Sequence, residues 1–144
     1  MNEYAVVDEV PPLEDYLRLR VLTGLSPKSR EGAAIGLPNS VLGVTVRNYT
    51  GVVGMGRVIG DHGLFFQVTD IAVDPVHQGQ GLGKKIVASL MRRLNDMAPD
   101  GSYVSLIADG EAHRLYAQFG FVSTAPASIG MACFIRPLQK LQTE

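Results

Sequence analysis

The chain has 144 residues and a net charge of −1, which fits one domain with a real core and leaves too little length for a second. Its 46% hydrophobic and 19% charged content is that of an ordinary globular protein and gives no electrostatic reason to expect nucleic acid or an anionic membrane as partner. With one cysteine, Cys133, an internal disulfide and the usual thiol-based zinc sites are excluded. The sequence predicts a single domain over residues 1–144.

The first residues offer no basic segment followed by an apolar stretch, and no window approaches the roughly 20 apolar residues of a membrane span. We therefore expect a cytoplasmic protein. Residues 4–7 are predicted to form a short strand. The proline pair Pro11-Pro12 favours a helix from Leu13 to Leu22 that ends at Gly24. The stretch 26–39, rich in glycine and proline, predicts a short helix or an irregular connection.

Three β-rich segments follow, at residues 41–46, 52–59 and 64–73. Turn-like segments separate them, so they are predicted to form an antiparallel meander. We expect the third strand to be buried on most of both faces and to end at Asp74-Pro75.

The second half of the chain predicts a long helix, a crossover and further elements. Apolar residues recur at helical spacing from Leu82 to Met97. A strand over 103–108 and a helix over 111–119, closed by Gly120, come next, and 121–122 and 131–135 are predicted to be the last two strands. This order indicates an α/β (α+β) fold: a mixed central sheet, with an antiparallel meander followed by a strand-helix-strand crossover, and helices on both faces.

The turn before the long helix reads Gln78-Gly79-Gln80-Gly81-Leu82-Gly83. Glycines let a ligand approach the backbone closely, and the first helical N–H groups are unpaired at the positive end of the helix dipole. The pattern predicts an anion site, to which Lys84 adds positive charge; a tight turn needed only for packing is the alternative. A dinucleotide fingerprint would need two residues between its last glycines, and a nucleotide phosphate loop would need Ser or Thr after Lys84.

Three motifs together resemble the GNAT acetyltransferase superfamily. The glycine turn is similar to the family's (Gln/Arg)-x-x-Gly-x-(Gly/Ala) signature. It stands between Asp70-Ile71-Ala72-Val73-Asp74-Pro75 and Leu115-Tyr116-Ala117-Gln118-Phe119-Gly120-Phe121, which is similar to the family's Leu-Tyr-x-x-x-Gly-Phe. The runs 53–57 and 59–61 and the pair Gly130-Met131 look like a branch that includes bacterial acetyltransferases and plastid serotonin N-acetyltransferases.

The resemblance implies that the strands over 64–73 and 103–108 run parallel and splay apart to admit the pantetheine arm of acetyl-CoA. It implies that main-chain groups of the first strand pair with that arm and that the turn amides hold the pyrophosphate. The cofactor-binding residues are then Ile71, Ala72, Val73, Gln78, Gly79, Gln80, Gly81, Leu82, Gly83, Lys84 and Asp109. No metal is expected.

The resemblance also implies that Tyr116 is the general acid toward the CoA sulfur, with aromatic packing as the alternative. Where several relatives carry glutamate this chain has Thr69, so the base is open. Gln67, on the same face, can position water but cannot accept the proton, so a water chain or a more distant group is expected to take it. We expect Asp70 to point away from Thr69 as a structural carboxylate. Asp109 is predicted to cap the following helix or to touch the pantetheine arm.

Other reactive side chains are isolated. His62 and His77 are predicted to lie on the solvated surface, and His113 shares a helix face with Tyr116. Cys133 is expected to be a small buried hydrophobe in the terminal strand. The basic residues Lys84, Lys85, Arg92 and Arg93 are expected to form a solvated helix face.

The function predicted is N-acetyltransfer from acetyl-CoA to a primary amine by direct attack in a ternary complex. The alternatives are a non-catalytic CoA-binding regulatory module and a flavin- or nucleotide-binding protein. The acceptor is a small-molecule amine or a protein lysine, because the family builds that pocket from variable segments, here 21–40 and 123–130. Nucleic acid and membrane are not expected as partners. A homodimer is suggested by the resemblance alone.

Overall fold

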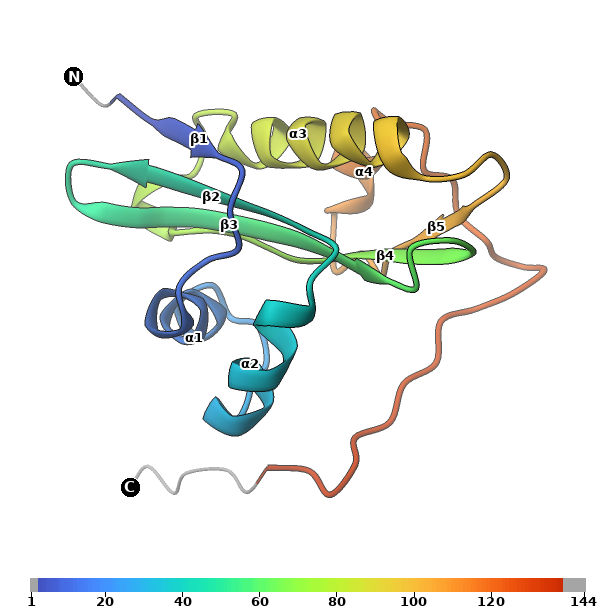
Figure 1. Ribbon diagram of the computed structural model, residues 1–144, viewed down its shortest axis with the longest axis horizontal. Helices are drawn as coiled ribbons and strands as arrows, with labels where there is room; N and C mark the ends of the chain where they lie inside the picture. The colour runs from blue at the N-terminus through green and yellow to red at the C-terminus, as the bar shows by residue number, and fades with distance from the viewer. Residues whose placement is uncertain (1–2, 139–144) are drawn as a thin grey trace.

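The computed structural model describes residues 3–138, whose strands form one five-stranded sheet in the order β1-β2-β3-β4-β5 (Figure 1). The strands are β1 (Ala5–Val7), β2 (Leu42–Asn48), β3 (Gly51–Gly60), β4 (Phe65–Val73) and β5 (Tyr103–Ser105). The first four pair antiparallel and β5 pairs parallel with β4. This confirms the predicted meander followed by a crossover.

Helices cover both faces of the sheet (Figure 1). The helices α1 (Leu13–Leu22) and α2 (Arg30–Gly36), with the 3₁₀ turn η1 (Leu37–Asn39), lie on one face. The long helix α3 (Leu82–Met97) lies on the other, and the short helix α4 (His113–Ala117) packs beside it. The short turn η2 (Pro75–His77) precedes the glycine turn. In the described residues no helix combines the length and the apolar character that a membrane crossing requires.

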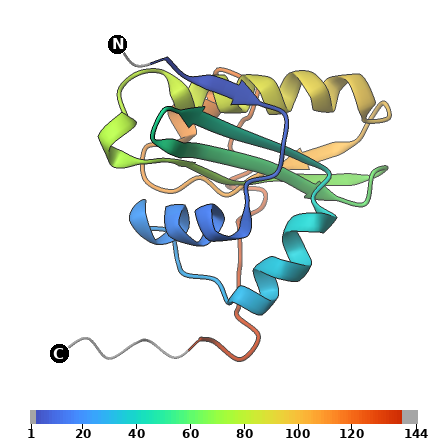
Figure 2. The same ribbon diagram turned by 60° about the vertical axis from the view of Figure 1, so that its left-hand side comes forward.

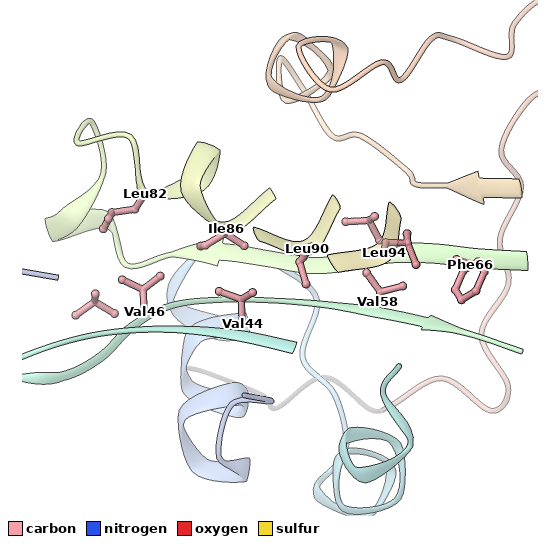
Figure 3. Packing of buried hydrophobic residues seen from close by; sticks show 10 residues of the cluster. Val44, Val46, Val58, Phe66, Leu82, Ile86, Leu90 and Leu94 are labelled. Atoms are coloured by element: carbon pink, nitrogen blue, oxygen red, sulfur yellow. The ribbon is translucent and has the colours of Figure 1, made fainter. Parts of the chain in front are cut away.

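The α3 face of the sheet is a continuous apolar layer. Figure 3 shows the α3 side chains facing those of the strands across this layer. Its buried members are Val44, Val46, Val53, Val58, Phe66, Val68, Leu82, Ile86, Leu90 and Leu94. The α3 members are four residues apart, so they form one stripe along the helix, as the periodicity predicts. Burying each such side chain contributes about 1.5–3 kcal/mol.

Gly56 on β3 lets α3 lie close to the sheet. A β-carbon added to Gly56 would come within 2.6 Å of Ile86 Cγ2 and 2.7 Å of Ile71 Cδ1. Real side chains do not approach that closely, so any larger residue would push the helix away. Because Gly56 has no side chain, α3 can pack close to the sheet, and this packing positions the glycine turn at the start of α3.

The α1 face holds a smaller apolar cluster that is interrupted by charged residues. Its buried apolar members are Tyr16, Leu19, Ala33, Leu37, Val52, Met55 and Ala72. Arg20 and Asp70 are buried on the same side of the sheet, where Arg20 Nη1 lies 2.8 Å from Asp70 Oδ1. The α1 face therefore contains both an apolar cluster and a buried ion pair.

A β-bulge interrupts β4 at Asp70. The pairs Met55↔Ala72 and Arg57↔Thr69 leave one extra residue on β4, and Asp70 has a φ of 60°. Asp tolerates this left-handed conformation better than most residues. Burial along β4 alternates between buried and half-buried positions and Phe65 is exposed, so the expectation of a strand buried on most of both faces is wrong.

The C-terminal third departs most from the prediction. In the described chain up to residue 138, neither 121–122 nor 131–135 forms a strand, and β5 stops at Ser105. These segments have β-rich composition but make no ladder with β5, and Val122 and Met131 are each 85% exposed. Cys133 is exposed as well, so its predicted burial is wrong. Figure 2 shows this segment running past α1 and α2.

Candidate functional site

The sheet opens at the point where β4 and β5 separate. Their parallel pairing ends at Gln67↔Ser105, although β4 continues to Val73. Beyond Gln67 the β5 side of β4 therefore has no strand partner in the described residues. This confirms the predicted splay between two parallel strands, and it leaves main-chain groups of β4 free to pair with an extended ligand.

The glycine turn brings uncapped amides to the start of α3. Gly79 and Gly81 have φ values of 81° and 77°, and Gly81 is the N-cap residue, without a side-chain cap bond. The first helical bond is donated by Lys85 N–H to the Gly81 carbonyl at 3.1 Å. A β-carbon at Gly79 or Gly81 would meet nothing within 4 Å. The amides of Leu82, Gly83 and Lys84 precede the first helical bond at the positive end of a 16-residue helix, an arrangement that suits a phosphate group.

Gln78 fastens this turn to the end of β4. Its Nε2 donates to the Val73 carbonyl at 3.0 Å. The Asp74 carboxylate accepts from Val76 N–H at 3.0 Å and so caps the 3₁₀ turn η2. The side chain of Gln78 thus already uses one main-chain acceptor of the segment predicted to pair with pantetheine.

A cleft of about 500 Å³ lies beside the bulge of β4. Its volume is in the usual range of small-molecule sites. Three elements line it: β4, the segment from β5 into α4, and the end of α1 with the loop that follows. The lining residues are Arg20, Gly24, Leu25, Ser26, Gln67, Val68, Thr69, Asp70, Ile71, Ile107, Asp109, Ala112 and Tyr116.

The cleft brings together three of the predicted cofactor-binding and catalytic residues, Ile71, Asp109 and Tyr116. Ala72 is buried in the α1-face cluster, and Val73 packs against the α3-face cluster. Gln78, Gly79, Gln80, Gly81, Leu82, Gly83 and Lys84 lie in the turn beyond the end of β4. The structure therefore divides the predicted residues between a cleft beside β4 and the glycine turn beyond the end of β4.

Tyr116 on α4 is 9% exposed and packs edge-on against Phe121, with ring centroids 6.2 Å apart. Burial raises the pKa of the Tyr116 phenol, and the negative charge of Asp109 raises it further. Its hydroxyl makes no hydrogen bond to any residue between 3 and 138. The phenol is therefore a protonated donor, available to a ligand in the cleft.

Asp109 does not cap α4. The helix has Ala112 as its N-cap residue and no side-chain cap bond. The contact that exists is between main chains, from Ala112 N–H to the Asp109 carbonyl at 3.0 Å. The capping alternative is therefore wrong, and the exposed carboxylate of Asp109 stays at the rim of the cleft.

Asp70 points toward α1, on the same side of the sheet as Thr69, so the expected opposite orientation is wrong. The period-two argument fails because the bulge inserts one residue. The carboxylate accepts from Tyr16 Oη at 3.1 Å, Arg20 Nη1 at 2.8 Å and Arg57 Nε at 2.7 Å. Burial, and then the charge of Asp70, raise the pKa of Tyr16. No local sequence signal links these distant residues.

The remaining candidates lie elsewhere. His62 is exposed, as predicted, whereas His77 is half-buried with Nδ1 2.8 Å from Tyr4 Oη, which corrects its predicted surface position. His113 is exposed and its Nδ1 lies 3.2 Å from the Gly110 carbonyl, outside the cleft. Of the four basic residues on α3, Arg93 alone departs from a solvated position, because its Nη2 donates to the Gly43 carbonyl at 2.6 Å.

Comparison with known proteins agrees with this geometry. Residues 39–123 match the family model of the acetyltransferase (GNAT) domain. GCN5-related N-acetyltransferase 2, chloroplastic, from Arabidopsis thaliana is 38% identical over 80 residues, which are 56% of this chain and 30% of that protein. A histone acetyltransferase from Glycine max is 35% identical over 80 residues, 56% of this chain and 34% of that protein. The chain thus matches about a third of the length of these curated relatives.

A solved structure is similar over nearly the whole chain. It is a protein of unknown function from meticillin-resistant Staphylococcus aureus, described as a probable acetyltransferase. The TM-score is 0.88 at 44% identity, covering 92% of this chain and 100% of that one. The fold of this chain is therefore similar to the fold of that protein over most of both chains.

Proposed function

Because the chain belongs to the GNAT acetyltransferase family, we propose that it transfers an acetyl group from acetyl-CoA to a primary amine in a ternary complex. The observation that carries this proposal is the pairing of two features on one strand. The cleft with a protonated tyrosine lies beside the bulge of β4, and the uncapped glycine turn lies just beyond the end of that strand. Acetyl-CoA would suit this arrangement, with its thioester in the cleft and its pyrophosphate at the glycine turn.

We assign the diphosphate end to the glycine turn. The amides of Leu82, Gly83 and Lys84 precede the first helical bond and would donate to phosphate oxygens, with Gly79 and Gly81 holding the turn open. The free edge of β4 at Ile71 and its neighbours would receive the pantetheine amides. Acetyl-CoA supplies an acetyl group already activated as a thioester.

We assign proton donation to Tyr116. The amine nitrogen forms a bond to the acetyl carbon while the carbon–sulfur bond breaks, and the leaving sulfur needs a proton. The Tyr116 hydroxyl would give that proton and regain one from solvent. Its raised pKa keeps it protonated at neutral pH, so it starts each cycle as an acid.

The acceptor must arrive as an ammonium and react as a free amine. Thr69 and Gln67 line the cleft but neither accepts a proton at neutral pH. The Asp70 carboxylate is already occupied by three donors. We therefore propose that the proton leaves through water held by Gln67 and Thr69, and that the Asp109 carboxylate at the rim attracts the cationic acceptor as well as lying near the pantetheine arm.

A panel of amines identifies the class of acceptor. The soybean relative is named a histone acetyltransferase, so a protein lysine joins small-molecule amines as a candidate acceptor. We would measure thiol release from acetyl-CoA with tryptamine, spermidine, glucosamine, free lysine and a lysine-containing peptide. Amine-dependent release with at least one of them is expected. Binding of CoA with release on none would instead support the non-catalytic CoA-binding module.

A further inference from the structure

We propose that Asp70 is a positioning residue that holds both ends of the acceptor-binding segment, residues 21–40, through two arginine side chains. This inference rests on the proposed acetyl transfer, because segment 21–40 matters here as the wall of the acceptor site. The Asp70 side chain is 4% exposed and both of its oxygens accept hydrogen bonds from side chains of other elements. Asp70 therefore acts through those neighbours.

Two arginine side chains connect Asp70 to segment 21–40, and each is called an arm here. The first arm is Arg20 at the end of α1. Its Nη1 donates to Asp70 at 2.8 Å. Its Nε and Nη2 both donate to the Ser26 carbonyl, and Nη2 also donates to Ser26 Oγ at 2.9 Å. The planar guanidinium thus joins the β4 bulge to the loop after α1 in a fixed geometry. Gly24 and Leu25, which line the cleft, lie inside this connection.

The second arm is Arg57 on β3. Its Nε donates to Asp70 at 2.7 Å, and its Nη1 donates to Ser40 Oγ at 3.1 Å. Ser40 is the residue that follows the 3₁₀ turn after α2. The same carboxylate therefore reaches the far end of the segment, fourteen residues beyond Ser26, through a different side chain.

Tyr16 completes the cluster from the middle of α1. Its hydroxyl donates to Asp70 at 3.1 Å and its ring lies 5.7 Å from the Arg57 guanidinium carbon. All four residues are held by packing on the α1 face, with Tyr16 and Arg20 buried. The bulge matters here because it directs Asp70 toward α1 and away from α3.

Two consequences separate a positioning role from a general stabilising role. Loss of the carboxylate should loosen segment 21–40 and leave the glycine turn in place, because the turn is fastened by Gln78 to Val73 and by α3 to the other face. Loss of either arginine should also loosen only the part of segment 21–40 that it contacts. Loss of Arg20 should loosen the loop around Ser26, and loss of Arg57 should loosen the chain around Ser40.

Hydrogen–deuterium exchange on the full chain tests this directly, together with steady-state kinetics. In Asp70→Asn we expect faster amide exchange in 21–29 and 37–41, unchanged exchange in α3 and an unchanged Kd for acetyl-CoA. The KM for the best amine of the panel should rise by about tenfold or more, since small misplacements of a binding wall are costly. The matched control is Glu14→Gln, which removes an exposed ion pair between α1 and α2.

If Asp70→Asn does not fold, Arg20→Lys and Arg57→Lys decide the question. Faster exchange limited to 21–29 in Arg20→Lys and to 37–41 in Arg57→Lys would support the two-arm account. Uniformly faster exchange over sheet and helices, or no change in 21–40, would overturn it. Exchange does not depend on turnover. A chain that acetylates nothing but shows the local pattern therefore contradicts the proposed function alone.

Discussion

The two faces of the sheet are built from different chemistry. The α3 face is a mainly apolar layer of buried side chains from β2, β3, β4 and α3, and the buried polar residue of α3 is Ser89, whose hydroxyl donates to Asp8. The α1 face mixes a smaller apolar cluster with the Asp70 carboxylate, two arginines and a tyrosine hydroxyl. The comparison suggests a division of labour. The apolar face fixes α3 and its glycine turn, whereas the polar face shapes the cleft.

The polar arrangement has an energetic cost. Removing buried charges from water costs several kcal/mol for each ion, and a buried ion pair often gains little over a hydrophobic replacement. We interpret the Asp70 cluster as retained for geometry, because its donors reach Ser26 and Ser40 on opposite ends of one segment. Substitutions on the α3 face should then change mainly stability, whereas substitutions on the α1 face should change mainly the cleft.

Leu90→Ala should have the largest effect, because Leu90 is fully buried in the centre of the α3-face cluster. Deleting such a side chain leaves a cavity and should lower the free energy of unfolding by about 3 kcal/mol. Urea denaturation with linear extrapolation measures this. The folded fraction should still bind acetyl-CoA. A loss below 1 kcal/mol, on the order of a conservative swap, would contradict the apolar face as the source of stability.

Tyr116→Phe should affect rate and leave stability almost unchanged. Removing a general acid lowers kcat by about 100-fold, while the ring still packs against Phe121. Single-turnover and steady-state assays with the best amine measure the rate, and thermal unfolding is the control. An unchanged kcat would remove Tyr116 from the mechanism and leave aromatic packing as its role.

The pH dependence of kcat also tests Tyr116 as the general acid. The acid form of Tyr116 is present below its pKa in the folded protein and is lost as the pH rises through that value. Since burial and Asp109 raise this pKa above its ordinary value, kcat should not fall between about pH 7 and 9 on account of Tyr116. A descending limb in that window that disappears in Tyr116→Phe would contradict the raised pKa.

Gly56→Ala should destabilise the chain by about 2 kcal/mol, because the added methyl group overpacks against Ile86 and Ile71. The shift of α3 should also weaken acetyl-CoA binding. Chemical denaturation and calorimetry measure the two effects. Gly63→Ala is the control, since a β-carbon there meets nothing within 4 Å. Equal stability of the two variants would mean that α3 is free to move outward.

Glu14→Gln should have the smallest effect. The ion pair between Glu14 and Arg30 joins α1 to α2 on the surface, with both side chains more than half exposed. The pKa of the Glu14 carboxyl is lowered by its hydrogen bond to Arg30, but solvent screens such pairs. We expect no measurable change in Tm or in KM. A clear change would show that segment 21–40 is held from the surface as well.

The sequence predicts the α3 face well and the α1 face poorly, for physical reasons. The apolar stripe from Leu82 to Leu94 and the β-rich meander are periodic local signals, and the structure confirms them. The bulge at Asp70 has no such signal, because a single inserted residue leaves the strand composition unchanged. Its partners Tyr16 and Arg57 are 54 and 13 residues away in the chain.

The failure at the C-terminus has a different cause. Composition reports that residues 131–135 suit a strand, but a strand also needs a neighbour with free main-chain groups in register. In the described residues β5 is a three-residue edge strand, Tyr103–Ser105, and 131–135 does not pair with its outer edge. The exposed Cys133 follows from the same missing pairing.

The central claim is that the glycine turn binds the pyrophosphate of acetyl-CoA, and calorimetry on Gly81→Ala tests it most directly. Open space surrounds Gly81, so the change acts through the φ of 77° and should cost about 1–2 kcal/mol in the turn. We predict about tenfold weaker binding of acetyl-CoA and unchanged binding of S-acetyl-pantetheine, which has no phosphate. Equal weakening of both ligands, or of neither, would contradict the claim.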